Sequence, residues 1–144
     1  MTLALDVNLL AYASDGASPF QERAEQAING LAQGNESVYI FWPVVLGYLR
    51  ISTNAQAFRT PLAFDRALGN IDRLLALPHF RSGSERDGFL SVLEEVSSET
   101  PLRGNLISDA HIVALMRQHG ISTIWTHDRD FRKFDGIRVV DPFA

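Results

Sequence analysis

Short apolar segments alternate with helical segments along the whole chain, and this alternation limits the fold more than any other feature of the sequence. Segments that are short, apolar and rich in β-branched or aromatic residues favour strands. They are 3–5, 38–42, 122–125 and 137–140, with a shorter candidate at 80–81. Apolar residues at helical spacing predict helices after Asp6 and over 19–33, 43–51, 64–77, 85–96 and 105–119. This order is typical of an α/β fold with a mostly parallel central sheet flanked by helices, here as a single domain over residues 1–144.

The composition narrows the class of protein. Of the 144 residues, 46% are hydrophobic and 21% are charged, which is typical of a globular protein with a real core. The chain has no cysteine, so disulfides and thiolate metal sites are excluded. No apolar run approaches the roughly 20 residues that span a bilayer, and we find no signal peptide, so we expect a cytoplasmic protein. The formal net charge of -4 excludes binding of nucleic acid through bulk charge alone.

One predicted helix carries an acidic residue among apolar neighbours. The middle of the predicted helix 105–119 has apolar side chains on nearly every side, which indicates a helix buried in the body of the domain. Asn105 is a suitable N-cap and Gly120 is a suitable end. Asp109 lies in the second turn, where a carboxylate is costly unless the helix dipole or, more effectively, a bound cation compensates it. His111 lies two positions further on, which predicts a different face of the helix.

Two further aspartates follow predicted strands. Asp6 follows the first strand, and Asp128 follows the strand at 122–125. Ligand sites in open parallel sheets form at the carboxyl ends of the strands, so both residues can meet Asp109 at one edge of the sheet. Carboxylates held close together repel one another, and a divalent cation removes that conflict. A set of ligands made only of oxygen atoms, with no thiolate, suits Mg²⁺ or Mn²⁺. Such an ion can orient and activate a water for phosphodiester hydrolysis.

These candidates also have purely structural explanations. An aspartate after a strand commonly forms a turn or caps a helix, which is an alternative for Asp6, Asp128 and Asp130. Asn8 and Thr126 are compatible with ordinary turns as well as with polar groups that position the acids. The sequence alone therefore leaves both kinds of role open.

Three segments of the sequence resemble one known family. Residues 5–10 (LDVNLL), 104–111 (GNLISDAH) and 126–131 (THDRDF) are similar to segments of the PIN-domain ribonucleases, in particular the VapC toxins of bacterial toxin–antitoxin systems. Segment order, spacing and length agree over nearly the whole chain, and so does the ending at 138–142. The resemblance implies a PIN-like fold, an endoribonuclease activity that depends on Mg²⁺ or Mn²⁺, a homodimer and a cognate VapB-like antitoxin.

The same resemblance suggests roles for individual residues. It implies that Asp6, Asp109 and Asp128 are the catalytic and metal-binding acids. It places three auxiliary polar residues beside them, which are Asn8, Thr126 and Asp130.

One position departs from the family. Many members carry a glutamate in the helix after the second strand, within a segment resembling Glu-Phe-Leu-Arg, whereas this chain has Gly47 at the position of the glutamate. One acid of the cluster is therefore missing, which argues against a two-metal site, and Asp130 is a candidate for partial compensation. Two functions follow: a metal-dependent endoribonuclease that is the toxin of a toxin–antitoxin pair, or a catalytically weakened PIN-like protein that binds RNA or an antitoxin.

Contacts with RNA require local cations in an acidic domain. Arg50, Arg103 and Arg129 are candidates because they flank the predicted acidic segments, although a solvated surface position is the simpler explanation for each. The further candidates are Arg59, Arg132 and Lys133. An acidic pocket would suit an antitoxin that carries arginines. The helices at 19–33 and 43–52 are candidates for a dimer interface.

Overall fold

Five strands form one sheet in the computed structural model, which describes residues 1–144, and every neighbouring pair of strands is parallel. The strands are β1 (Thr2–Leu5), β2 (Ser37–Tyr39), β3 (Phe80–Arg81), β4 (Thr123–Trp125) and β5 (Arg138–Val140). Their order across the sheet is β3-β2-β1-β4-β5. The predicted α/β class and the parallel central sheet are confirmed.

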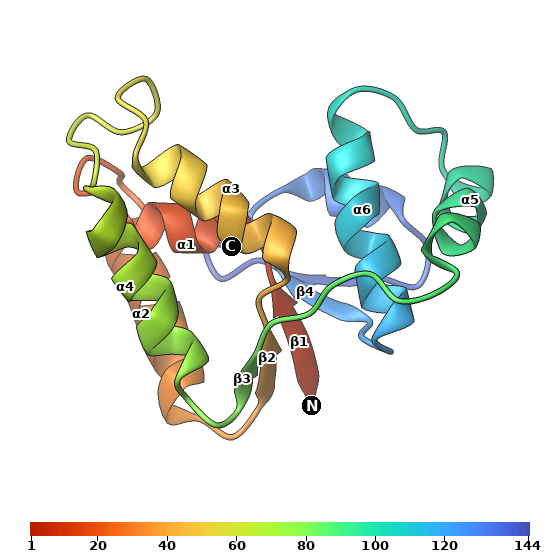
Figure 1. Ribbon diagram of the computed structural model, residues 1–144, viewed down its shortest axis with the longest axis horizontal. Coiled ribbons are helices and arrows are strands. Elements are labelled where there is room, and N and C mark those ends of the chain that lie inside the picture. The colour runs from red at the N-terminus through yellow and green to blue at the C-terminus, as the bar shows by residue number, and fades with distance from the viewer.

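Helices cover both faces of this sheet (Figure 1). The α-helices are α1 (Val7–Ser14), α2 (Gln21–Gln33), α3 (Trp42–Ser52), α4 (Phe64–Leu75), α5 (Phe89–Glu99) and α6 (Asn105–Gln118), and a 3₁₀ helix, η1, spans Arg129–Lys133. In Figure 1 the helices α1 to α4 lie on one side of the sheet, and α5 and α6 lie on the other. None of these helices combines the length and the apolar character that a membrane crossing requires.

The direction of strand addition reverses at β1. The chain first adds β2 and β3 on one side of β1 and then crosses over to add β4 on the other side. Leu5 of β1 pairs with Trp125 of β4, so Asp6 and Thr126 are the next residues at the carboxyl ends of two adjacent strands. In open parallel sheets such a reversal leaves a crevice for ligands at these strand ends. The topology therefore places the predicted aspartates at the edge where a site is expected.

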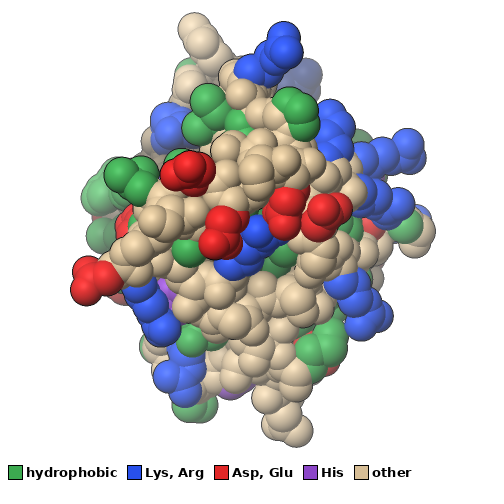
Figure 2. Space-filling model, turned by 90° about the vertical axis from the view of Figure 1, so that its right-hand side faces the viewer, with side chains coloured by type: hydrophobic (Ala, Val, Ile, Leu, Met, Phe, Trp, Pro, Cys, Tyr) green, Lys and Arg blue, Asp and Glu red, His purple; other side chains and the backbone are tan.

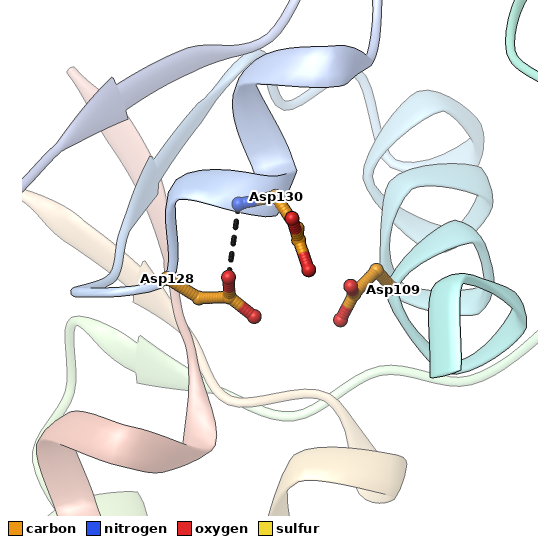
Figure 3. Close-up of side chains that lie close together, drawn as sticks. All are labelled: Asp109, Asp128 and Asp130. Atoms are coloured by element: carbon orange, nitrogen blue, oxygen red, sulfur yellow. Dashed lines mark hydrogen bonds between the residues drawn. The ribbon is translucent and has the colours of Figure 1, made fainter. Parts of the chain in front are cut away.

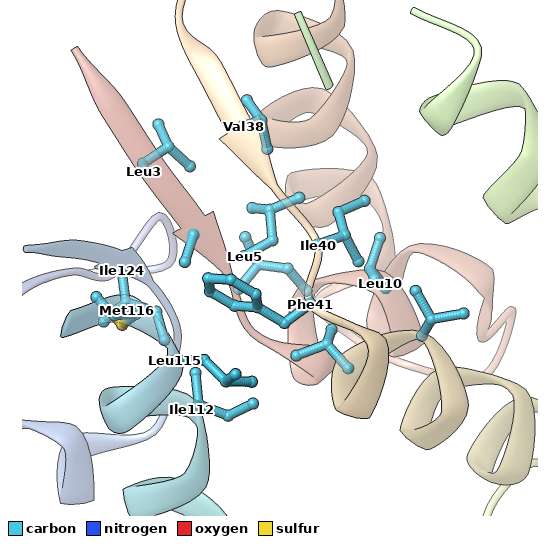
Figure 4. Close-up of a cluster of buried hydrophobic side chains, with 14 of the residues drawn as sticks. Leu3, Leu5, Leu10, Val38, Ile40, Phe41, Ile112, Leu115, Met116 and Ile124 are labelled. Carbon is cyan, nitrogen blue, oxygen red and sulfur yellow. The ribbon is translucent and has the colours of Figure 1, made fainter. Parts of the chain in front are cut away.

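A continuous hydrophobic core holds the sheet between its two helical layers. One cluster of 30 buried hydrophobic residues includes side chains from both layers, so the two layers share one core (Figure 4). The three apolar residues of β1, Leu3–Leu5, are completely buried, as expected for the central strand of a parallel sheet. Residues 112–116 of α6 are also buried, which confirms the prediction for the middle of that helix. The first turn of α6 is largely exposed.

Three element boundaries differ from the sequence predictions for local reasons. Strand β2 ends at Tyr39, and Trp42 begins α3 instead of ending the strand, because Phe41 adopts an extended N-cap conformation and a proline occupies the first turn. Helix α5 begins at Phe89, directly after Gly88 with φ 82°. Asn105 is not the N-cap of α6 but its first residue.

The remaining predicted boundaries lie within a few residues of those observed. Helix α2 begins at Gln21, and α4 ends at Leu75. The N-cap of α6 is Gly104, whose φ of 57° is readily adopted only by glycine, and this moves the helix start by one residue. Gly120, with φ 69°, follows the C-cap of α6 and confirms the predicted end of that helix.

Candidate active site

Asp6 connects the end of β1 to the start of α1. Its Oδ1 accepts the backbone N–H of Val7 at 2.8 Å, so Asp6 is the N-cap of α1. Its Oδ2 accepts the Thr126 hydroxyl at 2.7 Å and the Asn8 amide at 3.3 Å. Burial raises the pKa of the Asp6 carboxyl, the hydrogen bonds from Thr126 and Val7 oppose this, and the nearby Asp128 raises it further. The helix-capping explanation for Asp6 is thus confirmed, and the same carboxylate also lies at the predicted edge.

Thr126 is the junction of the polar network at the ends of β1 and β4. Its side chain is completely buried. Besides donating to Asp6, its hydroxyl accepts the Asn8 amide at 3.1 Å and the backbone N–H of Asp128 at 2.9 Å. Asn8 in turn accepts the backbone N–H of His127 through Oδ1 at 3.3 Å. Asn8 and Thr126 therefore hold the two strand ends together and orient Asp6, as the auxiliary role requires.

Three carboxylates face one another beside this network (Figure 3). Oxygen atoms of Asp109, Asp128 and Asp130 lie within 4.8 Å of one another. Asp109 projects from the second turn of α6, and the other two come from the segment after β4. Asp128 caps η1 by accepting the backbone N–H of Asp130 at 2.9 Å, so the capping explanation is confirmed for this residue also. This group of three half-buried oxygen donors suits a divalent cation such as Mg²⁺ or Mn²⁺.

The close group differs from the predicted trio in one member. The structure brings Asp109 and Asp128 together as predicted, but the third carboxylate of the group is Asp130 and not Asp6. Both oxygens of Asp6 already accept hydrogen bonds within the protein. Lys133 places its ammonium 3.1 Å from Asp130 and partly balances the charge of the group.

Asp109 experiences the combined field of these acids. Burial and the charges of Asp128, Asp6 and Asp130, in that order, raise the pKa of Asp109 to about 7, and Lys133 opposes the shift. Without a bound cation, a proton on Asp109 would relieve the repulsion near neutral pH. The four aspartates therefore behave as one electrostatic unit, which is the behaviour expected of a site that attracts a cation.

A cleft of about 520 Å³ opens between α3 and the second turn of α6. Asp6 and Asp109 line it on the acidic side. The residues that α3 contributes are Trp42, Pro43, Val44, Leu46, Gly47, Arg50 and Ile51. The acids are thus accessible from a concave surface large enough for part of a substrate.

Gly47 lies in the wall of this cleft, where the family glutamate would stand. A Cβ atom at Gly47 would meet the Val7 side chain at 3.4 Å, which is an ordinary van der Waals contact. Close helix packing therefore does not require glycine here. The missing acid leaves open space in the cleft.

The sequence analysis missed one ion pair in the cleft. His111 Nε2 lies 2.6 Å from Glu85 Oε1, and both residues line the cleft together with Asp109. Two hydrogen bonds lower the pKa of the Glu85 carboxyl. The larger contribution comes from the backbone N–H of Glu85 itself, and the next from His111. His111 and Asp109 both line this cleft, together with Ser108 and Ile112 of the same helix. Glu85 lies in the loop before α5, and no sequence pattern connects it to α6.

The predicted RNA-binding arginines are spread over the surface. Arg50 lines the cleft, Arg103 lies in the loop before α6, and Arg129 begins η1. All three are exposed and none belongs to an ion pair. Figure 2 shows that acidic and basic side chains are mixed on the face that carries α5 and α6. That face is therefore not a uniform basic surface for nucleic acid.

Two solved structures have the same fold. VapBC2 from Rickettsia felis, bound to a DNA fragment from its promoter, matches with a TM-score of 0.68 and 15% identity over 97% of this chain and 98% of that chain. Mycobacterium tuberculosis VapC20, described as a sarcin-ricin loop cleaving toxin, matches with a TM-score of 0.67 and 17% identity over 94% and 98% of the two chains. At these identities the likeness concerns the fold alone.

Sequence comparison extends the relationship from the fold to the family. The model of the PIN domain family matches residues 3–137. Ribonuclease VapC48 of Mycobacterium tuberculosis is 47% identical over 144 residues, which are 100% of this chain and 99% of the relative. With its five-stranded parallel sheet and its acidic edge, this chain belongs to the PIN-domain family of VapC ribonucleases.

Proposed function

We propose that this protein is a metal-dependent endoribonuclease that hydrolyses RNA phosphodiester bonds and acts as the toxin of a toxin–antitoxin pair. The observation that carries the proposal is the meeting of Asp109, Asp128 and Asp130 next to Asp6, where the sheet order reverses. A full-length relative at 47% identity that is named a ribonuclease supports it. One core cluster with residues from β1 to the C-terminal segment supports treating residues 1–144 as one domain.

We assign the metal ligands and catalytic acids to Asp6, Asp109 and Asp128, with Asp130 as an additional acid. Mg²⁺ or Mn²⁺ is the proposed ion, because the site offers carboxylate oxygens and the chain contains no cysteine. Such an ion supplies charge neutralisation at the phosphate and a water activated for in-line attack. Thr126 and Asn8 hydrogen-bond to each other and to the Asp6 carboxylate, so they hold this carboxylate in one orientation at the ends of β1 and β4.

The partners follow from the same family. The solved VapBC complexes support a cognate VapB-like antitoxin, and the relative named a ribonuclease supports RNA as the substrate. An antitoxin with arginines would match the acidic edge through charge-assisted hydrogen bonds. A homodimer through α2 and α3, RNA contacts by Arg50, Arg103 and Arg129, and a cytoplasmic location stay predictions from the sequence.

Gly47 favours one alternative function. With one family acid missing, a catalytically weakened PIN-like protein that binds RNA or an antitoxin would use the same fold without cleaving. The two functions differ in whether a metal ion supports turnover. They are separated by measuring RNA cleavage and Mn²⁺ binding together.

The test is cleavage of a mixed pool of structured RNA by the purified protein, in Mg²⁺ or Mn²⁺ and in EDTA. Asp6→Asn and Asp109→Asn are compared with Asp72→Asn, which changes an exposed acid of α4 far from the cleft. We expect cleavage that requires the metal and both site aspartates and is unaffected in the control. A folded protein that binds Mn²⁺ without cleaving the pool would indicate a narrow RNA target. If it neither cleaves nor binds Mn²⁺, the binding-only alternative is correct.

A further inference from the structure

We propose that one side of α3, formed by Trp42, Leu46 and Arg50, is a binding subsite for an unpaired nucleotide of the RNA next to the acidic group. This inference rests on the proposed function, because it names the part of the substrate that the same cleft would hold. The three residues are four positions apart, so they form a single stripe on the helix. All three line the cleft that also contains Asp6 and Asp109.

The exposure of this stripe is unusual for its residue types. The exposed fraction is 44% for Trp42 and 63% for Leu46, although both are large hydrophobic side chains. The opposite side of α3 is packed into the core, where Val44, Val45 and Tyr48 are buried. The stripe is therefore not needed for folding, and it presents an aromatic ring and an aliphatic surface to the cleft.

The backbone around Trp42 is held in place, so binding has only the side-chain torsions of Trp42 to order. Phe41, the N-cap residue of α3, is completely buried. The backbone N–H of Trp42 donates to the carbonyl of Gly83 at 3.2 Å, which ties the start of the helix to the loop after β3. A rigid aromatic platform loses less entropy on binding than a flexible one.

Gly47 leaves room between this stripe and the acids. It lies in the cleft wall beside Leu46, and a Cβ atom added there would meet only the Val7 side chain within 4 Å. A residue with a long side chain would occupy the space that lies next to Asp6 and Asp109. In this chain the space is open to a ligand that spans from the stripe to the carboxylates.

The charges favour a nucleotide over an apolar protein segment as the occupant. Arg50 is exposed and forms no ion pair, so its guanidinium is available to a phosphate. Unpaired bases are commonly recognised by stacking on aromatic side chains, with nearby cations for the backbone. The cleft volume of about 520 Å³ falls within the range typical of ligand sites. An aromatic ring, a free cation and phosphodiester-cleaving acids in one cleft together match RNA.

The experiment measures binding separately from cleavage. The Asp109→Asn protein is titrated in Mn²⁺ with a fluorescein-labelled single-stranded oligoribonucleotide of mixed sequence. Anisotropy gives the affinity, and tryptophan emission reports stacking on Trp42. We expect Trp42→Ala to weaken binding about tenfold, in line with the loss of one stacked base. Trp42→Phe should keep the affinity within about threefold but lose the quenching, because the aromatic surface remains while the fluorophore is removed.

Phe64→Ala is the matched control, because Phe64 is an exposed aromatic residue on α4 that does not line the cleft. Its affinity should equal that of the parent.

Binding and quenching that depend on Trp42 in a protein that never cleaves would support the subsite while contradicting the proposed activity. Active wild-type protein whose affinity for RNA and KM are unchanged by Trp42→Ala would overturn the subsite alone. A change of oligomeric state in Trp42→Ala at unchanged affinity would also overturn it, since the stripe would then be an interface between copies. Absence of any binding of this oligoribonucleotide overturns the subsite, whereas the proposed activity is decided separately by the cleavage test.

Discussion

The two sides of the acidic edge are built differently. On the strand side, Asp6 and Asp128 each accept a hydrogen bond from a backbone N–H, and the Thr126 hydroxyl donates to Asp6 and accepts the backbone N–H of Asp128. On the helix side, Asp109 forms no hydrogen bond with the protein, although it is partly buried and faces the other acids. The strand side is therefore organised before any ligand arrives, whereas the helix side has a carboxylate without a hydrogen-bond donor, whose repulsion from the other acids Lys133 offsets only in part.

The two sides of the acidic edge therefore contribute differently: the strand side mainly to folding stability, and the helix side mainly to affinity for a cation. Hydrogen bonds to Asp6 stabilise its charged form and contribute to the joining of β1 and β4. Burial and the neighbouring acids destabilise the ionised form of Asp109. A cation that bridges α6 and the segment after β4 would therefore remove this electrostatic repulsion from the folded state. Substitutions on the strand side should therefore act on folding, and substitutions on the helix side should act on metal binding.

The largest expected effect is stabilisation by the metal ion. Mn²⁺ at about 100 times its dissociation constant should raise the free energy of unfolding by about 2.7 kcal/mol, which corresponds to several degrees in the melting temperature. Asp109→Asn should lose most of this gain, because it removes the carboxylate of α6 from the group. Calorimetric melting at pH 8 with and without Mn²⁺ measures both values. An equal shift in the two proteins would mean that the ion binds without α6.

On the strand side, Thr126→Val should destabilise the protein by about 2 kcal/mol. The valine preserves the shape but removes the hydroxyl, so the Asn8 amide and the Asp128 N–H lose an acceptor and Asp6 loses its shortest side-chain donor. Urea unfolding in EDTA gives the change in free energy. Thr60→Val is the control, because Thr60 is exposed in a loop and its side chain forms no hydrogen bond. Equal unfolding midpoints for the two variants would show that the network contributes nothing to stability.

A smaller effect should appear in the pH dependence of the metal-free protein. The pKa of Asp109 is about 7 in the folded protein, whereas the ordinary value of 3.8 applies in the unfolded chain. Between these values the folded protein retains a proton that the unfolded chain releases. Stability should therefore fall as the pH rises from about 4 to 7 and level off above that range. In Asp109→Asn this contribution is absent, so the variant should gain stability relative to the wild type as the pH rises. Melting curves in EDTA between pH 5 and 8 test the sign. A constant difference across that range would contradict the raised pKa.

The smallest expected effect comes from restoring the missing acid. Gly47→Glu should fit, since its Cβ meets Val7 at an ordinary distance, and its carboxylate would enter the cleft beside Asp6 and Asp109. We expect Mn²⁺ to bind several-fold more tightly, because an additional carboxylate adds charge and an oxygen ligand. Gly47→Gln controls for the size of the side chain without the charge. Isothermal calorimetry compares the two variants, and equal affinities would show that position 47 does not reach the ion.

Much of the site follows from local sequence. Asp6 directly follows β1, Asp128 lies three residues after the end of β4, and the carboxyl ends of neighbouring parallel strands must meet at one edge. Asp109 is recognisable because its helix is otherwise apolar around the middle. The bounds of α3 and α6 were less predictable, because they depend on the backbone conformations of Phe41 and Gly104. Such conformations result from packing and backbone freedom and leave no periodic pattern in the sequence.

The fold class, the parallel sheet and the presence of several aspartates at one edge of it could be predicted from the sequence alone. These features depend on periodicity and on the order of strands and helices, which are local properties of the chain. Only the tertiary structure decided which acids approach most closely, replacing Asp6 by Asp130 in the group around Asp109. It also decided that Glu85, His111 and the exposed side of α3 share one cleft with Asp6 and Asp109. These contacts join residues far apart in the chain, and their distances depend on how the helices pack across the sheet.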